Sequence, residues 1–339
     1  MPAFALSALS LLLLAAAKDA PVPPPSEIGV IYQGALGPSR RVLLDLRFAG
    51  DEEGQEAIDG GLEGFGSGGA LELDGARDSL GLHFDQADLD AEAFTGHWEA
   101  RIEGDSLRGI WSNPDSATTY PFALARAGRT LEWVSDAPDL SLDYPEIERG
   151  NDPTRAALNA RILEAATAAW RAEWKALSAL PEIDAGDEEE AAAPYSELSL
   201  SIEALGEGTA SLLLSRSEWS GGDAADLSLE PLNLVWRDGA WQRFDLASLA
   251  RPGADLATRL EQLCLRELEA TGASVIGGDP STAIRAQFAS LTLTPRGIRL
   301  HFTGDAVVAD SEEPFELDVP YEDLLDLLDP SGPAAPFLR

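Results

Sequence analysis

The stretch FASLTLTPRGIRLHFTGDAVVADSEEPFELDVPYEDLLDLL, residues 288–328, decides the fold of the C-terminal half of this chain. Two alternating apolar runs meet at residues 294–297, where Pro and Gly favour a tight turn. A third run carries Phe315, Leu317 and Val319 on one face, and the final YEDLLDLL predicts a short helix. The pattern predicts a small antiparallel sheet with one apolar face. No residue set within it indicates a reaction.

The residues before this stretch supply elements that can pack on such a sheet. A helix is predicted to start at Asp152, which can cap it, with Pro153 in its first turn and Trp170 on its apolar stripe. Four strand-like runs follow, and then a second helix over residues 255–270. Strands joined mostly by short turns indicate an α+β domain with an antiparallel sheet and packed helices, placed at residues 140–329.

The N-terminal part has a different pattern. Residues 28–128 alternate with period two between turn clusters, which predicts an antiparallel β-meander closed as a small barrel or a sandwich. The stretch TGHWEARIEGDSLRGIWSNPDSATTYPFAL, residues 95–124, has a Gly-x-Trp rhythm and resembles the closing hairpin of an avidin-like or lipocalin-like barrel. The pattern changes around residues 131–144, which indicates a domain boundary. The expected fold class is therefore mixed.

The two ends of the chain have their own composition. Residues 1–17 contain an apolar run ending in three alanines, which predicts a signal peptide too short to span a bilayer. Residues 18–27 form a Pro-rich linker, and residues 330–339 are expected to be a tail. A periplasmic or secreted protein without a transmembrane helix is therefore expected. Cys264 is the only cysteine, and its apolar helical setting predicts a buried, inert thiol.

The formal net charge of −35 restricts the partners that the protein can bind. Nucleic acid is excluded as an expected partner, because phosphate binding needs clustered Lys and Arg. A strongly negative field favours cationic partners and speeds their approach. The other interpretation is that the acidity only keeps an exported protein soluble, and the sequence leaves both open.

A family resemblance covers residues 143–328. The order YPEIE, DPTRAALNARI, SRSEWSGGDAADLSLEPLNLVW, FDLASL and LTLTPRGIRLHF, closed by ELDVPYEDLLDLL, resembles the RsiV-like extracytoplasmic domain family. Members include the ectodomains of lysozyme-sensing anti-sigma factors. The resemblance implies an antiparallel α+β fold and a recognition domain of the cell envelope. It also implies a partner such as a cationic lysozyme or a peptidoglycan-associated protein.

The sequence departs from this family at one conspicuous place. Where the family commonly has Gly-Gly-Ala-His, this chain has Gly221, Gly222 and Asp223 followed by an alanine, so no histidine is present. Trp219, next to these residues at a strand end, is the tryptophan that we expect to be exposed. Trp219, Gly221, Gly222 and Asp223 are therefore the predicted binding residues.

Two histidine-carboxylate pairs suggest a metal site in the N-terminal region. His83 and Asp85 alternate on one strand, and His97 and Glu99 alternate on the next. A hairpin between them could place His83 across from His97, and two imidazoles with two carboxylates would suit zinc. The alternative is a solvated polar face with ordinary cross-strand contacts. No cofactor is expected.

The sequence supports three functions to different degrees. The first is a non-enzymatic, exported protein that recognises a cationic protein or a cell-wall component. The second is a carrier of a small apolar ligand, with an open barrel lined by Phe84, Trp98 and Trp111. The third is a hydrolase that uses two carboxylates, which the abundance of acidic residues neither singles out nor excludes. His301 is expected on the surface, and the pattern gives no indication of the oligomeric state.

Overall fold

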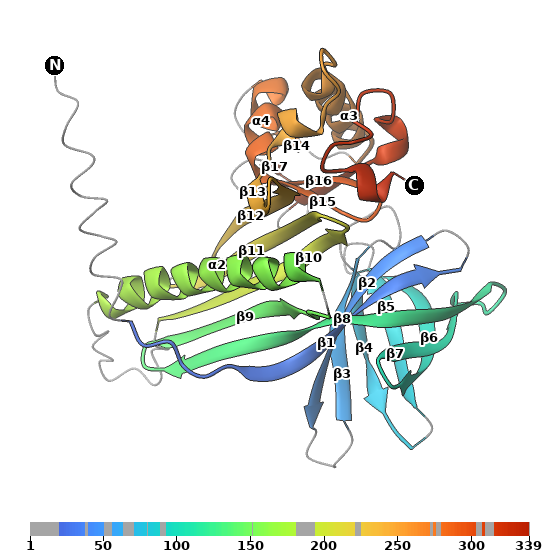
Figure 1. Cartoon of the computed structure of the whole chain (residues 1–339), viewed down its shortest axis with the longest axis vertical. Coiled ribbons are helices and arrows are strands. Elements are labelled where there is room, and N and C mark those ends of the chain that lie inside the picture. Colours follow the sequence, from blue (N-terminus) through green and yellow to red (C-terminus); the bar gives the residue numbers. More distant parts are fainter. Residues whose placement is uncertain are drawn as a thin grey trace.

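The computed structural model describes residues 20–37, 40–50, 56–63, 71–79, 81–88, 93–150, 152–180, 194–220, 225–271, 274–275, 279–302, 307–308 and 315–338. Eight strands form a barrel, and further strands and helices follow it along the chain (Figure 1). The barrel strands are β1 Ser26–Leu36, β2 Arg40–Gly50, β3 Glu56–Glu63, β4 Leu71–Arg77, β5 Leu82–Asp88, β6 Ala93–Glu103, β7 Ser106–Ser112 and β8 Thr119–Asp136. The predicted signal peptide lies outside the described residues.

The barrel closes because its first strand also pairs with its eighth. Consecutive strands are antiparallel neighbours from β1 to β8, and β1 pairs antiparallel with β8, for example at Tyr32–Arg126 and Leu36–Phe122. Alternate residues of each strand point inward, as period two requires. The mixed fold class is thus confirmed, and of the two predicted forms of the meander the structure has the barrel.

Aromatic and aliphatic side chains fill the interior of the barrel. Trp98 stacks on Phe84 at 5.5 Å between ring centroids and meets Phe122 edge-on at 4.9 Å. Phe84, Trp98 and Trp111 are 2%, 1% and 4% exposed, so they belong to a packed core. Gly96 is the glycine of one Gly-x-Trp repeat. A larger residue does not fit there, because a Cβ would lie 2.3 Å from Nε1 of Trp111. The open pocket on which the carrier hypothesis depended is therefore not formed by these three rings.

Strand β8 continues beyond the barrel and joins it to the next sheet. Its second half pairs antiparallel with β9 (Asp139–Ile147), and the sheet runs on through the predicted boundary at residues 131–144. Residues of β1 and β2 alternate between two cores: Tyr32 packs inside the barrel, whereas Ile31 and Leu43 pack outside it with the core of the following sheet. The barrel wall is therefore also one face of the second core. The division into two domains stays a prediction.

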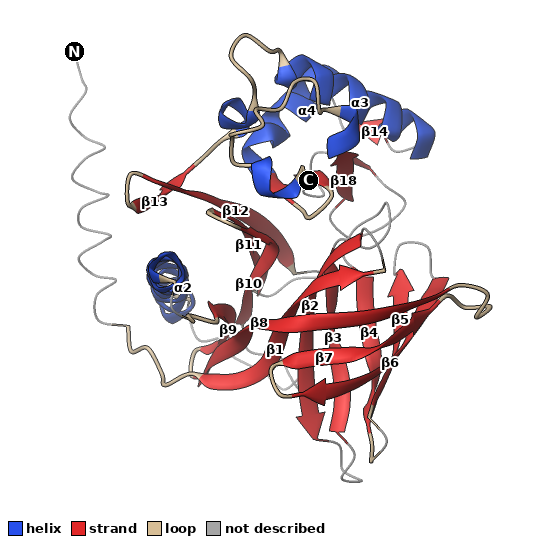
Figure 2. Ribbon diagram, turned by 45° about the vertical axis from the view of Figure 1, so that its right-hand side comes forward, coloured by secondary structure: helices blue, strands red, loops and turns tan. Residues whose placement is uncertain are grey.

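Helix α2, Pro153–Ser178, covers the second sheet. The side chain of Asp152 accepts from the backbone N–H of Thr154, and Pro153 occupies the first turn, as predicted. The helix connects β9 to β10 (Tyr195–Gly206), which pair in parallel, and it runs along these strands (Figure 1). Figure 2 shows the helix nearly end-on, beside the same strands. This parallel pair is the exception in a sheet otherwise built from antiparallel neighbours.

The C-terminal part adds a smaller sheet and its helices. The remaining elements are β11 Thr209–Trp219, β12 Asp226–Arg237, β13 Ala240–Arg243, α3 Leu256–Thr271, β14 Ser274–Val275, α4 Pro280–Ala286, β15 Leu291–Leu293, β16 Gly297–Phe302, β17 Val307–Val308 and β18 Phe315–Pro320. The order β15–β16–β18 is antiparallel, so the opening stretch forms the predicted sheet. Cys264 on α3 is buried, as predicted. Of the helices that the structure describes, none has both the length and the apolar character of a membrane span.

Candidate functional site

A cavity of about 380 Å³ lies where the outer face of the barrel meets the second sheet. Strands β1 to β4 and β8 form the barrel wall, and β9 and β10 contribute the other. Charged and hydroxyl side chains dominate the lining, with apolar residues between them. The polar residues are Asp45, Arg47, Asp59, Glu72, Thr130, Asp143, Ser199, Ser201 and Glu203. Five carboxyl groups thus share the cavity with one guanidinium, so acidic side chains outnumber basic ones in the described lining.

Asp45 is one of three acidic residues on the barrel wall of the cavity, with Asp59 and Glu72. It points outward because its neighbours Leu44 and Leu46 point into the barrel core. Both of its oxygens lie within 3.0 Å of Thr130 Oγ1, at 2.9 and 3.0 Å, so that hydroxyl donates to this carboxylate. Burial, only partly opposed by the nearby charge of Arg47, raises the pKa of Asp45 to about 6. A cation in the cavity would stabilise its ionised form.

The charge of Arg47 is already engaged within the wall. Its Nη2 lies 2.5 Å from Oδ2 of Asp143, and the hydroxyl of Ser199 donates to the same oxygen at 2.9 Å. Arg47 comes from the barrel and Asp143 from β9, so this ion pair ties the two walls together. The one guanidinium of the lining is therefore paired with Asp143, and it does not neutralise the other acidic groups of the lining.

The cavity is open on the barrel side because a glycine occupies β3. Gly61 pairs with Asp45 on β2 and with Glu72 on β4, so its missing side chain leaves space between two carboxylates. A Cβ built on Gly61 would meet nothing within 4 Å. At the neighbouring Gly60, by contrast, a Cβ would lie 2.0 Å from the carbonyl oxygen of Asp45, so close packing of the strands excludes a side chain there.

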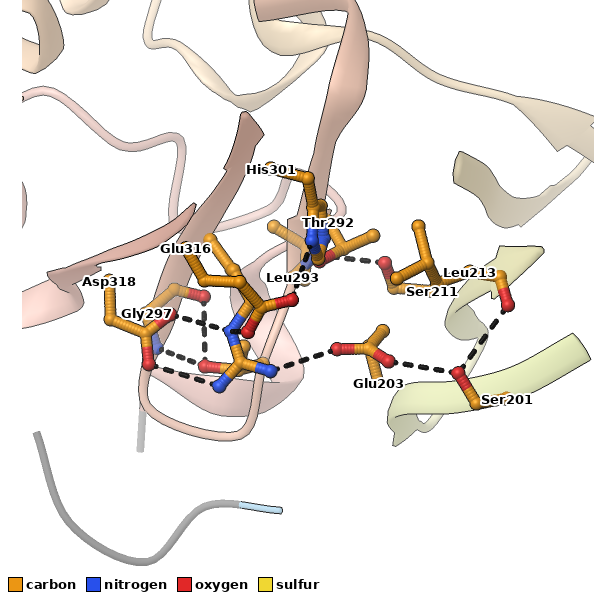
Figure 3. A network of polar contacts seen from close by, with 12 residues as sticks. Ser201, Glu203, Ser211, Leu213, Thr292, Leu293, Gly297, His301, Glu316 and Asp318 are labelled. Carbon is orange, nitrogen blue, oxygen red and sulfur yellow. Dashed lines mark hydrogen bonds and ion pairs between the residues drawn. The ribbon is translucent and has the colours of Figure 1, made fainter. Parts of the chain in front are cut away.

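Glu203 connects the far wall of the cavity to a buried ionic network (Figure 3). Its Oε1 accepts from Ser201 Oγ at 3.0 Å, and its Oε2 lies 3.2 Å from Nη1 of Arg299 on β16. Arg299 also contacts Asp318 at 2.8 Å and Glu316 at 3.3 Å. Burial raises the pKa of Glu203 even though Arg299 opposes the shift. Three carboxylates surround one permanent cation in this network.

His301 extends the network on the far side of Glu316. Its Nδ1 lies 2.8 Å from Oε1 of Glu316, and its Nε2 lies 2.8 Å from Oγ1 of Thr292. Burial alone would raise the pKa of Glu316, but the hydrogen bond from His301 and the charge of Arg299 lower it. The expectation that His301 lies on the surface was wrong: its side chain is fully buried, because β16 is covered on both faces.

This series of hydroxyl, imidazole and carboxylate has the order of a nucleophilic triad, which sequence spacing did not reveal. Thr292 and His301 are both 0% exposed, however. A nucleophilic hydroxyl has to reach a substrate carbonyl, and this one is enclosed by protein. The arrangement satisfies buried polar groups in the described structure and is better explained as a structural network.

Trp219, the one predicted binding residue that the structure describes, does not line the cavity. Trp219 ends β11, is partly buried, and stacks on Tyr195 with 6.2 Å between ring centroids. Gly221, Gly222 and Asp223 lie outside the described residues. The expected exposure of Trp219 is therefore only partial, and the role of this loop in binding stays a prediction.

The four predicted metal ligands share the outer face of β5 and β6, but in another register. His83 lies across from Glu99 and Asp85 across from His97, so His83 does not face His97 as predicted. His97 Nδ1 contacts Asp85 Oδ1 at 2.5 Å, and His83 Nε2 lies 3.6 Å from Asp78. The two histidines thus have different carboxylate partners, Asp85 for His97 and Asp78 for His83. Throughout the part of the chain that the structure describes, no group of three or more His, Cys, Asp or Glu could hold a metal ion.

The cavity residues escaped the sequence patterns because they come from distant strands. Asp45 and Glu203 each interrupt an apolar run, and an acidic residue within such a run is a signal that could have identified them. The signal does not reveal their partners, however. Thr130 and Arg299 become neighbours of these carboxylates only through the closure of the barrel and the docking of the small sheet.

Comparisons with known proteins provide structural neighbours. No protein-family model matches the sequence, and no curated protein matches it either. A DUF3298 family protein from Pseudomonas aeruginosa PAO1 is 18% identical, with a TM-score of 0.38 over 56% of this chain and 85% of that chain. A DUF3298 family member from Bacteroides fragilis NCTC 9343 is 13% identical, with a TM-score of 0.41 over 72% of this chain and 98% of that one. The structural neighbours are thus members of the uncharacterised DUF3298 family, and the function has to be inferred from the cavity.

Proposed function

We propose that this protein is an exported, non-enzymatic recognition protein of the cell envelope that binds a cationic protein at the cavity between barrel and second sheet. The observation that carries the proposal is the cavity lining, in which five carboxylates face one guanidinium that is already paired with Asp143. A cavity with convergent polar groups and a perturbed pKa is the usual place to expect a binding site. The net charge of −35 would steer a basic partner toward it.

The resemblance of residues 143–328 to RsiV-like domains supports the kind of partner. It suggests a lysozyme-like or peptidoglycan-associated cationic protein, and it agrees with the predicted signal peptide in suggesting a periplasmic or secreted location. Both the family and the location belong to the proposal. They are independent of the cavity and can fail separately from it.

Titration calorimetry with a cationic lysozyme tests the proposal. We expect binding at low ionic strength that weakens strongly at 0.5 M salt, because screening shortens the reach of the field. Glu72→Gln, at the cavity, should weaken binding by up to about fivefold, which corresponds to about 1 kcal/mol for a solvent-exposed ion pair.

The matched control is Asp74→Asn on the same strand. It makes the same change in charge on the same face of β4, but Asp74 does not line the cavity. Equal losses in the two variants would show that only the overall charge matters. Absence of any heat with the wild-type protein at low salt would contradict the proposed partner.

A second candidate is a carboxylate hydrolase, and one observation favours it. Asp45 has its pKa raised to about 6, and Asp143 in the same cavity is held by Arg47. Two carboxyl groups in such different surroundings are the arrangement of an acid and its partner in glycoside hydrolysis. Release of soluble fragments from purified peptidoglycan, lost in Asp45→Asn, would establish this activity. Its absence, together with lysozyme binding, would leave the recognition protein.

A further inference from the structure

The size and lining of the cavity restrict what part of a partner can enter it. Its volume of about 380 Å³ is near the lower end of the range for ligand pockets, roughly 300–1,000 Å³, so it suits one side chain and not a folded segment. Ile31, Leu43, Leu200 and Ile202 provide apolar wall between the polar groups. A long side chain with an aliphatic stem and a charged head would match both kinds of surface.

We infer that the cavity takes a single arginine side chain of the partner, and that Glu203 gives up a proton to solvent when the guanidinium arrives. This inference rests on the proposed function, since it names the group that the cationic partner inserts. The guanidinium keeps its own protons throughout, and the only bond that breaks is the O–H bond of the Glu203 carboxyl, whose proton passes to water or buffer. Binding is therefore accompanied by the net release of a proton.

The arrangement of acceptors favours arginine over lysine. Asp45 and Thr130 lie on the barrel side, and Ser199, Ser201 and Glu203 lie on β10 across the cavity. A guanidinium has five N–H donors in a planar fork, so it can reach acceptors on both walls. An ammonium group is a compact, strongly hydrated charge and would lose more hydration for fewer contacts.

Glu203 has surroundings that favour its protonated form more than those of an ordinary glutamate do. On the side of the small sheet it faces Arg299 and, beyond that cation, Glu316, Asp318 and His301. Three carboxylates thus share one permanent cation in a buried place, and a proton on one of them lowers the cost of burying their charge. Burial raises the pKa of Glu203, whereas the hydrogen bond from His301 and the charge of Arg299 lower the pKa of Glu316.

On the cavity side the charged groups are of both signs but do not neutralise Glu203. Asp45 adds negative charge, and the Arg47–Asp143 pair is internally compensated. Arg47 is the one cation of the described lining, and Arg299, which pairs with Glu203, lies outside that lining. A guanidinium entering the cavity would supply the missing positive charge, and the ionised carboxylate would then be favoured.

Blocked tripeptides of sequence Gly-Arg-Gly, Gly-Lys-Gly and Gly-norleucine-Gly provide the test. We expect the arginine peptide to bind at least about tenfold more tightly than the lysine peptide at pH 7, and the norleucine peptide not to bind. Calorimetry in phosphate and in Tris buffer, which differ in ionisation enthalpy, measures the protons released per peptide bound. Wild-type protein should release a substantial fraction of one proton.

Comparing Glu203→Gln with Glu72→Gln tests whether the released proton comes from Glu203. Glu203→Gln should bind the arginine peptide with little proton release, whereas Glu72→Gln, also at the cavity, should release as much as wild type. Ser201→Ala removes the hydroxyl that donates to Glu203, so it should shift the pH dependence of binding upward. Circular dichroism confirms that each variant is folded, and Ser201→Ala serves as the second test if Glu203→Gln is not.

The possible outcomes separate the inference from the proposed function. Arginine-selective binding with proton release that depends on Glu203 supports both. Binding without proton release, equal release in Glu203→Gln, or equal affinity for lysine overturns the inference, while lysozyme binding would still support the proposed function. Failure of the arginine peptide to bind overturns the inference, and failure of lysozyme as well overturns the proposed function.

Discussion

Asp45 is the residue at which the fold and the proposed site make opposing demands. The barrel needs an outward-facing residue at this position of β2, and the second sheet then covers it in part, so a partly buried carboxylate has one hydroxyl partner. Leu or Thr would satisfy the fold at lower cost. A carboxylate at this position is consistent with a site that binds a cation.

Replacing Asp45 with Asn should stabilise the protein at neutral pH. The folded-state pKa of about 6 lies above the ordinary 3.8, so folding favours the protonated form. The contribution to stability is complete below about pH 4 and is lost as the pH rises through 6. Asp45→Asn should therefore raise the free energy of unfolding at pH 7 by up to about 3 kcal/mol and change it little at pH 4.

Urea denaturation of wild type and variant at the two pH values measures this difference. Asp59→Asn is the control, since Asp59 lines the same cavity but is exposed. It should alter the free energy of unfolding by less than about 0.5 kcal/mol. A loss of stability in Asp45→Asn at pH 7 would contradict the proposed burial of the charge.

Gly61 should determine whether the cavity can be entered. Gly61→Leu places an aliphatic side chain in open space, so the protein should fold with its stability unchanged or raised by about 0.5–1 kcal/mol, because glycine weakens a strand. The side chain would occupy the volume of the ligand, and binding of the blocked arginine peptide should fall at least about tenfold. Gly61→Ala is the matched control and should bind normally. Full binding by Gly61→Leu would place the ligand elsewhere.

At the scale of elements, one asparagine fixes the position of helix α2. Asn159 is buried, and its amide accepts from the backbone N–H of Ile147 and donates to the carbonyl of the same residue, both at 2.8 Å. The side chain of Asn159 thus bonds the backbone of Ile147, at the end of β9, as a neighbouring strand would. Asn159→Ala would leave two buried backbone groups unpaired, at a cost of about 2–4 kcal/mol in the free energy of unfolding.

Denaturant unfolding and hydrogen exchange of the Ile147 amide measure this effect. Leu163→Ala on the exposed face of the same helix is the control, with an expected change below about 0.5 kcal/mol. An unchanged exchange rate at Ile147 in Asn159→Ala would show that water replaces the side chain.

The elements also show what local patterns could predict. Helix α2 was predictable because Asp152, Pro153 and Trp170 encode a cap, a first turn and an apolar stripe within one segment. The barrel strands were predictable because alternation is local. The pairing of β1 with β8 was not, and neither was the register of His83 with Glu99, because pairing depends on residues far along the chain or on turn geometry. The lining of the cavity could not be predicted for the same reason, because its residues come from strands that such pairings bring together.

At the scale of the whole molecule, strand β8 and the barrel wall connect the two cores. Ile31 and Leu43 belong to the core under α2 although their strands form the barrel. We therefore expect the described parts of the barrel and of the second sheet to unfold in one transition. Tryptophan fluorescence and far-UV circular dichroism in urea should give coincident midpoints. Two separated transitions would instead support the predicted boundary at residues 131–144.

Cys264 makes the chemistry of these experiments simple. It is the only cysteine in the chain, it lies on the buried face of α3, and burial raises the pKa of its thiol to about 12. Alkylating and dye reagents react with thiolates, so the native protein should be almost inert to them at neutral pH. A cysteine introduced at the mouth of the cavity could then carry a fluorophore alone, without removal of the natural thiol, and would report directly when a ligand enters.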